Sequence, residues 1–381
     1  MRCCAVILLL AAGLAGCNGS TATSSGPSTP QPPAPPPSGS TSQPQPPAPQ
    51  PGPPLHRARR IHVTGGLVAE LYATGLGHPT AMVFGPDGRL YVTEDPDRLV
   101  AVRPGSGHPA PFVSGLRVPL GLAWIGRTLY ISEQGRMESV RLSGRAAVGR
   151  GTVLSNLPYG RHQQDNVVVM NGRLVFGSGS TCDVCSERSR LSAAILSVRP
   201  DGRDLRVVAR GARNPFGLAV DPANGLLYAT VNGQDELGTP SNPQPAEMLV
   251  RVRDGAWYGW PTCWPNARSL AMTGSCAGVD SPAAFLEPHS SADGLAFATA
   301  ATLAGRYAGD AFVAEWGEYL SDVHGRVVVR VQLAPDGAQS RVSVFARGFD
   351  HPIAVLADPA GGLLVADWGR GTIYRIRAPV S

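Results

Sequence analysis

The sequence contains no lysine, so all 33 of its basic residues are arginines. Charged residues make up only 16% of the 381 positions, the net charge is +5, and the densest basic stretch is Arg57-Ala-Arg-Arg60. Nucleic-acid-binding proteins concentrate basic residues in a stripe or patch, and no such run exists here, so we expect no nucleic-acid partner. No long segment repeats apolar residues every 3.6 positions, which argues against a helical solenoid or a coiled coil.

Long apolar runs are also missing, and none reaches the length that a membrane span needs. The main short run, residues 5–12, follows Arg2 and precedes Leu-Ala-Gly-Cys at 14–17. This order of charge, apolar core and small residues predicts an export signal over residues 1–16. The string at 14–17 resembles the bacterial lipobox, in which Cys17 becomes the lipidated first residue. We therefore expect a lipid-anchored protein of the cell envelope at the outer membrane, with an ordinary secretory signal as the alternative.

Residues 17–56 lack the composition of a folded domain. Fourteen of the 36 prolines lie between Pro27 and Pro54, and no charged residue occurs from Asn18 to Leu55. Such a segment cannot bury a core and favours the extended polyproline II conformation. We expect a disordered spacer that follows the lipidated cysteine. A docking site for a proline-binding module is the alternative.

Cysteine is scarce, and its distribution indicates an oxidising compartment. Cys3 and Cys4 leave with the signal, and Cys17 is lipidated. Four cysteines remain in the body of the chain: Cys182, Cys185, Cys263 and Cys276. An even number in an exported chain predicts two disulfides, and local pairing (182 with 185, 263 with 276) is the simplest of three arrangements. A zinc site of four cysteines and a redox-active pair at 182–185 are the alternatives.

The rest of the chain repeats one pattern six times. Each copy has a short apolar run, a turn rich in Gly, Asp or Asn, and a second apolar run. The copies begin at His78, Val118, His162, Arg213, Ala292 and His351. Asp-Gly, Asn-Gly and Gly-Gly between such runs predict β-hairpins. Further strands are predicted after some copies, as at residues 98–103 and 372–377.

Hairpin units that recur every 40 residues or more predict an all-β chain folded as a six-bladed β-propeller of four-stranded antiparallel blades. We place this domain at residues 57–381. The third, fourth and sixth copies open on His162, Arg213 and His351. Residues that open the inner strands meet around the central axis, so a functional site is expected at that end of the ring.

Two strings carry a resemblance to a known family. Residues 211–238 contain Arg-Asn-Pro at 213–215 and Asp-Glu-Leu at 235–237, and Trp-Tyr-Gly-Trp-Pro follows at 257–261. Together they resemble the soluble PQQ-dependent sugar dehydrogenases, closest to the sorbosone dehydrogenase branch. The resemblance extends over residues 65–377. It implies oxidation of an aldose or related aldehyde or alcohol by hydride transfer to pyrroloquinoline quinone (PQQ), assisted by Ca²⁺, with an electron acceptor in the envelope.

The resemblance also implies roles for individual residues. His162 matches the catalytic base, and neutral imidazole suits that task. Arg213 matches a residue that contacts the cofactor and stabilises its developing charge, with Asn214 beside it. The Ca²⁺ loop falls on consecutive residues with hard oxygen ligands: Gly233, Gln234, Asp235 and Glu236. Trp257, Tyr258 and Trp260 are expected to pack beneath this loop.

The chain departs from the family's pattern at several positions. Ser180 stands where an aspartate orients the histidine base, so we expect Asp165 to take that role. Trp316 and His351 fall on cofactor-binding positions, although His351 replaces a usual arginine. Glu315 occupies a position where a cation is expected. Arg306 or Arg326 would then have to supply that positive charge.

Two other functions stay open. A non-catalytic envelope propeller would bind a glycan or a partner protein at the same end of the ring. A hydrolase of the lactonase kind would need carboxylates from several blades. The dehydrogenase hypothesis requires that His162, Arg213 and the Asp235 loop converge at one mouth of the propeller.

Overall fold

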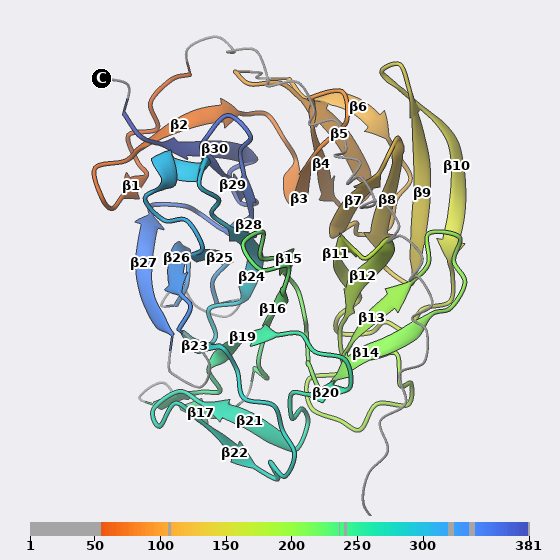
Figure 1. The fold of residues 1–381 in the computed structure, drawn as a ribbon, viewed down its shortest axis with the longest axis vertical. Helices are drawn as coiled ribbons and strands as arrows, with labels where there is room; N and C mark the ends of the chain where they lie inside the picture. Colours follow the sequence, from red (N-terminus) through yellow and green to blue (C-terminus); the bar gives the residue numbers. More distant parts are fainter. Residues whose placement is uncertain are drawn as a thin grey trace, which may run out of the picture. The chain divides into compact units, whose positions relative to one another are not determined.

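The computed structural model describes residues 55–105, 108–235, 237–239, 242–318, 324–334 and 340–379. All of them lie in one compact unit, Pro46–Ser381. The predicted signal, Cys17 and almost all of the spacer fall outside the described residues, as does Glu236. The described part forms six antiparallel sheets arranged in a ring, which confirms the six-bladed β-propeller (Figure 1).

The first three blades follow one another along the chain. Blade 1 contains β3 (His78–Phe84), β4 (Leu90–Asp95), β5 (Arg98–Val102) and β6 (Ala110–Val113). Blade 2 contains β7 (Gly121–Ile125), β8 (Thr128–Glu133), β9 (Arg136–Ser143) and β10 (Ala146–Leu154). Blade 3 contains β11 (Gln164–Met170), β12 (Arg173–Ser178), β13 (Ala194–Val198) and β14 (Arg206–Arg210), and β20 (Ala256–Trp257) adds to it in parallel.

The last three blades carry the longer insertions. Blade 4 contains β15 (Leu218–Val220), β16 (Leu227–Val231), β19 (Glu247–Arg251) and β23 (Ala284–Leu286). Blade 5 contains β24 (Ala292–Phe297), β25 (Ala311–Glu315), β26 (Val327–Gln332), β27 (Arg341–Arg347) and the short β1 (His62–Val63). Blade 6 contains β28 (Pro352–Ala357), β29 (Leu363–Asp367), β30 (Thr372–Arg377) and β2 (Val68–Ala73).

Three smaller elements lie outside the blades. They are the hairpin β17 (Leu237–Thr239) with β18 (Asn242–Gln244), the hairpin β21 (Cys263–Asn266) with β22 (Ala271–Gly274), and the 3₁₀ turn η1 (Thr302–Gly305). Figure 1 shows β17, β21 and β22 projecting from the ring near blade 4. Among the described residues, no helix has the length and apolarity to cross a bilayer.

Each predicted hairpin forms the inner pair of a blade. In the third copy, Asn171 and Gly172 both have positive φ (50° and 70°), the pattern of a type I′ turn between antiparallel strands. The strands on either side consist mainly of Val, Leu and Phe, which suit a pleated surface buried between neighbouring blades. The local turn chemistry therefore accounts for the repeat.

The beginnings of the inner strands contact one another around the ring. Hydrogen bonds link neighbouring blades at this level, among them Thr80 Oγ1 to Pro119 O (2.6 Å), Asn166 N to Phe216 O (3.1 Å) and Thr230 Oγ1 to Asp293 O (2.7 Å). Glycine permits the close approach elsewhere. A Cβ added to Gly121 would lie 2.6 Å from Asp165 O, and one added to Gly294 would lie 2.6 Å from Ile353 O. These contacts bring the residues that precede each inner strand to one end of the ring, which we call the mouth.

Strands from the two ends of the described chain close the ring. β2 pairs antiparallel with β30, so that Ala69 lies opposite Ile376. Ile376 is fully buried in a cluster that also contains Leu363, Val365 and Phe345. β2 therefore supplies the outermost strand of blade 6 and joins the N-terminal part of the described chain to its last blade.

We expect Ile376→Ala to lower the free energy of unfolding by about 2–5 kcal/mol, because it leaves a cavity at the closing strand pair. Val344→Ala serves as the matched control, since Val344 is 37% exposed, and should change stability by no more than about 0.5 kcal/mol. Guanidinium unfolding followed by circular dichroism measures both. Equal losses in the two variants would contradict the role given to this closure.

Candidate active site at the mouth of the propeller

The predicted site residues of blades 3 and 4 converge at the mouth. His162 precedes β11, Arg213 and Asn214 precede β15, and Asp235 follows β16. Ser180, which contacts the His162 ring, donates its backbone N–H to Arg213 O at 2.7 Å. The Arg213 guanidinium in turn lies 3.3 Å from Asp235 Oδ2. The convergence that the dehydrogenase hypothesis requires is therefore present.

The hydrogen bonds of His162 define its tautomer. The Nδ1 atom lies 3.3 Å from Ser180 O and 3.0 Å from Ser180 Oγ. A carbonyl oxygen only accepts hydrogen bonds, so Nδ1 carries the hydrogen and Nε2 keeps a lone pair. Ser180 thus orients the ring, and the expectation that Asp165 does so is wrong. Asp165 lies at a β-bulge of β11, where its side chain is buried and its Oδ2 atom accepts no hydrogen bond from the described residues.

The surroundings of His162 keep its ring neutral. Burial and the nearby Arg213 charge lower the pKa of His162 from 6.5 to about 3. Both causes penalise the imidazolium form, the first by desolvation and the second by repulsion. At any neutral pH the ring therefore has an unprotonated Nε2 that can accept a proton.

Arg213 is the most deeply buried cation of the site, with only 2% of its side chain exposed. Its Nε donates to Asp183 O at 3.1 Å, and its Nη2 donates to Asp183 Oδ1 at 2.5 Å and to Asp235 Oδ2 at 3.3 Å. Arg161 also pairs with Asp235. Burial alone raises the pKa of Asp183, but the Asp235 N–H and the Arg213 guanidinium outweigh burial and hold that pKa below its ordinary value.

A second layer of polar side chains supports the loop at residues 233–235. Glu247 accepts the Gly233 N–H at 2.5 Å, and Asn214 Nδ2 donates to Asn232 Oδ1 at 2.7 Å. Burial raises the pKa of Glu247 to about 7 and that of Asp293 well above its usual range. The carbonyls of Gly233 and Gln234 accept no hydrogen bond from the described residues. They remain available as ligands for a hard cation such as Ca²⁺.

Aromatic side chains of blades 1, 5 and 6 lie at the same mouth. We call His78, Trp316, His351 and Trp368 the aromatic platform. The ring centroids of His78 and Trp368 are stacked 4.0 Å apart, and those of Trp316 and His351 are 4.2 Å apart. Trp316, Trp368 and Phe216, a residue of blade 4 close to Arg213, pack against one hydrophobic cluster. The platform therefore borders the same axis as the polar site.

The structure also shows which of the two candidate arginines, Arg306 or Arg326, lies at the mouth. Arg326 Nη2 donates to His351 Nε2 at 3.3 Å, so Arg326 lies at the mouth. Arg306 instead donates to Gly65 O in the loop between β1 and β2. Glu315 is only 1% exposed, and burial raises its pKa well above the usual range. Burial therefore favours the uncharged form of Glu315 over the carboxylate.

Disulfides join Cys182 to Cys185 and Cys263 to Cys276, the pairing that the sequence spacing favours. These bonds occupy all four sulfurs, so a zinc site of four cysteines does not form. Cys182 and Cys185 also lie near Glu187 with the spacing of a metal cluster, but both sulfurs are bonded to each other. Of the three aromatic residues expected beneath the loop at 233–236, Trp260 donates its Nε1–H to Asp183 O at 3.3 Å and so contacts the site. Tyr258 is buried and donates its hydroxyl to Arg251 O, and the Trp257 ring lies 5.8 Å from the Arg210 guanidinium.

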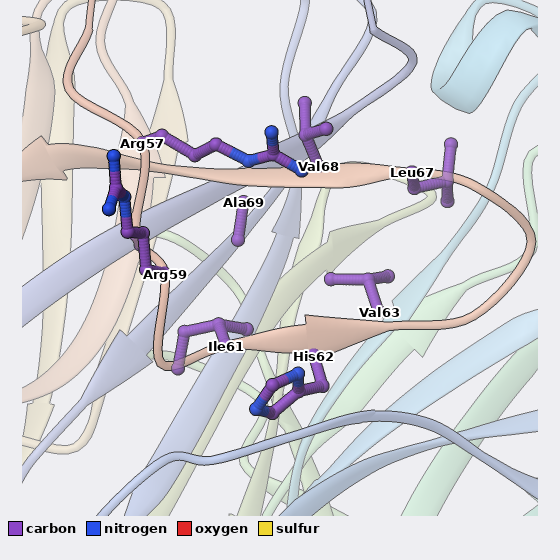
Figure 2. Close-up of a pocket in the computed structure, with 9 residues that line it drawn as sticks. Arg57, Arg59, Ile61, His62, Val63, Leu67, Val68 and Ala69 are labelled. Carbon is purple, nitrogen blue, oxygen red and sulfur yellow. The ribbon is translucent and has the colours of Figure 1, made fainter.

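A cavity of about 460 Å³ lies between β1 and β2, and no predicted site residue lines it (Figure 2). Figure 2 shows Ile61, Val63 and Ala69 pointing into this space, while His62 and Val68 point away. Its lining combines these apolar side chains with Arg57, Arg59 and His62, and it lies at the outer strands of blades 5 and 6, away from the predicted site residues. We assign the chemistry to the mouth instead.

Comparison with known proteins finds a family match in the second half of the chain. Residues 197–373 match the family described as Glucose / Sorbosone dehydrogenase. The match includes Arg213, Asp235, Trp316 and His351, whereas His162 precedes it. A search of curated proteins finds no match.

Several solved structures share the fold at low sequence identity. The calcium structure of the Trichoderma reesei Carbohydrate-Active Enzymes Family AA12 protein has a TM-score of 0.72 and 17% identity, covering 84% of this chain and 97% of that one. The holo pyranose dehydrogenase PQQ domain from Coprinopsis cinerea has a TM-score of 0.68 and 17% identity, covering 86% and 98%. The PQQ-bound aldose sugar dehydrogenase from Streptomyces coelicolor has a TM-score of 0.64 and 22% identity, covering 86% and 99%.

Three contributors to the site were not identified from the sequence. Asp183 lies inside the Cys-x-x-Cys string, whose spacing indicates a disulfide, a zinc site or a redox-active pair but no partner for Arg213. Glu247 and Asp293 belong to apolar strand patterns and have no local motif. The one available signal was that an acid within a predicted strand must have a buried partner or be protonated.

We expect the His162 ring to titrate near pH 3 instead of 6.5, as measured by ¹⁵N NMR of the imidazole. Between these values the unfolded chain binds a proton that the folded chain does not, so the free energy of unfolding falls as the pH is lowered. His162→Gln should show a smaller fall over this window than the wild type. A ring that titrates near 6.5, or an unchanged pH dependence in the variant, would contradict this assignment.

Proposed function

We propose that this protein is a PQQ- and Ca²⁺-dependent oxidoreductase that oxidises an aldose or a related aldehyde or alcohol. The observation that carries the proposal is the convergence of one histidine of lowered pKa, one buried arginine and the Asp235 loop at a single mouth. The family match over residues 197–373 and the dehydrogenases that share the fold support it.

The residues at the mouth fit both groups. Ca²⁺ prefers carbonyl and carboxylate oxygens, which Gly233, Gln234 and Asp235 offer. PQQ is a flat polyanion, which Arg213 can hold through charged hydrogen bonds and the aromatic platform through stacking. Asp183 and Asp235 already pair with Arg213. A cation bound at Asp235 would draw this carboxylate away from the guanidinium and leave a donor for the cofactor.

The chain's own residues then account for proton movement and orientation. PQQ, when bound, supplies the two-electron acceptor for the hydride. His162 Nε2 accepts the hydroxyl proton of the substrate, since Nδ1–H is held by Ser180. An anionic ligand at Arg213 offsets the positive charge that lowers the His162 pKa, and so makes the ring a stronger base. Arg213 stabilises the negative charge that develops on the oxidant.

The proposal places the protein in the cell envelope, anchored through Cys17 and a proline-rich spacer. Its partners would be a small sugar or aldehyde and an envelope electron acceptor. One observation favours a second function, a propeller that only binds a glycan or a partner protein. Arg213 is already neutralised by two carboxylates, while the aromatic platform offers flat faces that can stack on sugar rings.

We expect the domain without its signal to bind PQQ saturably in the presence of Ca²⁺ and to reduce a dye with at least one member of an aldose panel. Binding is measured by quinone absorbance. His162→Ala should keep PQQ binding but lower kcat by about 10²- to 10⁴-fold, because the base is lost. No binding at high micromolar PQQ would rule out the oxidoreductase and leave the binding propeller.

We expect Ca²⁺ at 100 times its Kd to raise the free energy of unfolding by about 2.7 kcal/mol, since it binds only the folded chain. Asp235→Asn should reduce this Ca²⁺-dependent gain, whereas Asp254→Asn, in an exposed turn, should not. Thermal unfolding with and without a chelator measures the effect in the absence of PQQ. The same Ca²⁺ shift in both variants would show that the metal binds elsewhere.

A further inference from the structure

The loop closed by the Cys182–Cys185 disulfide lies directly over the proposed site. It follows β12 after Gly179, Ser180 and Thr181. Only Asp183 and Val184 separate the two cysteines, and Val184 is 52% exposed at the tip. The disulfide therefore constrains a very short segment, one of whose two inner residues faces Arg213.

The loop positions Ser180, the residue that contacts the His162 ring. Ser180 Oγ donates its single hydrogen to Cys182 O at 2.7 Å. The same oxygen lies 3.0 Å from His162 Nδ1 and can act there only as an acceptor, because its hydrogen is already used. The position of the Cys182 carbonyl thus sets the orientation of the serine, which in turn holds the Nδ1–H tautomer.

The loop also supplies hydrogen-bond acceptors to the Arg213 side chain. The carbonyl oxygen of Asp183 accepts from Arg213 Nε at 3.1 Å and from Trp260 Nε1 at 3.3 Å. The Asp183 carboxylate accepts from Arg213 Nη2 at 2.5 Å and from the Asp235 N–H at 3.1 Å. One residue therefore connects the guanidinium, the predicted Ca²⁺ loop and the aromatic residue beneath them.

We infer that the Cys182–Cys185 loop fixes the positions of the His162 ring and the Arg213 guanidinium relative to each other. Ser180 and Asp183 are its positioning residues. The inference rests on the proposed function, since it names what orients that site's base and cation. The contact to Ser180 comes from Cys182 and the contacts to Arg213 come from Asp183, which are neighbouring residues of one closed loop. A shift of this backbone therefore displaces the base and the cation together. Reduction of the disulfide would release Asp183 and free the Ser180 hydroxyl to rotate.

The first test replaces the loop disulfide in the full folded domain by the double variant Cys182→Ser and Cys185→Ser. The matched control removes the other disulfide by Cys263→Ser and Cys276→Ser in the β21–β22 hairpin. We expect the loop variant to raise the Kd for PQQ by about 10- to 100-fold, as small misplacements of binding groups do. Its His162 ring nitrogens should shift in ¹⁵N NMR toward the values of mixed tautomers. The control pair should change neither readout.

Single substitutions separate the two links. Ser180→Ala should weaken the preference for the Nδ1–H tautomer with little effect on PQQ affinity, because the hydroxyl contact is lost while the Ser180 carbonyl contact remains. Ser180→Thr should restore the preference because it keeps the hydroxyl. Asp183→Asn should change PQQ affinity while the His162 spectrum stays that of the wild type. Unchanged ring shifts in the loop variant, or equal effects in the control pair, would overturn the inference.

Folding of the loop variant is checked by far-ultraviolet circular dichroism. Should it not fold, the folded wild type is treated with a dithiol, which passes two electrons and two protons to the disulfide and itself closes to a disulfide. The ¹⁵N chemical shifts of the His162 ring are then measured as a function of the number of free thiols. If the wild type binds no PQQ, the proposed function fails, but the tautomer readout still decides whether the loop positions His162.

Discussion

A guanidinium removed from water must be matched by negative charge and by hydrogen-bond acceptors, and Arg213 is such a group at the mouth of this propeller. An unpaired buried charge costs several kcal/mol, whereas a paired one is tolerated. Asp183 and Asp235 supply that pairing from two different loops. The position of the disulfide loop, of the segment after β16 and of Trp260 all follow from this requirement. Burial and the same charge together lower the pKa of His162, so Arg213 also influences the predicted base.

Much of the fold could be predicted because it is encoded by local chemistry. Turns such as Asn171-Gly172 specify hairpins between short apolar runs, and six repeats of one hairpin have few ways to bury their faces other than a ring. The additions to the blades could not be predicted in this way. β1 joins β27 and β20 joins β14 across large sequence separations, and β20 has only two residues. Such short strands depend on the space between neighbouring blades. A local sequence pattern contains no information about that space.

The candidate site could be predicted in part. His162 and Arg213 open inner strands, and that position alone places them near the axis, so a repeat pattern can identify them. Asp183 and Glu247 could not be found, because each acts across a contact between segments far apart in the chain. Asp165 was expected beside the base, but a bulge in β11 turns it into the buried interior. A bulge adds one residue to a strand, and the side-chain directions that follow cannot be counted from the sequence.

The acids at the mouth differ in what they contribute. Burial favours the neutral form of Glu315, while hydrogen bonds and the Arg213 charge favour the charged form of Asp183, so the two acids oppose an anionic cofactor to different extents. A crystal structure of the chain with PQQ and Ca²⁺ tests this account most directly. The account predicts the quinone beside Arg213 and His162, with Asp235 turned from the guanidinium toward the metal. A structure in which Arg213 keeps both carboxylates and the mouth holds no quinone would contradict it.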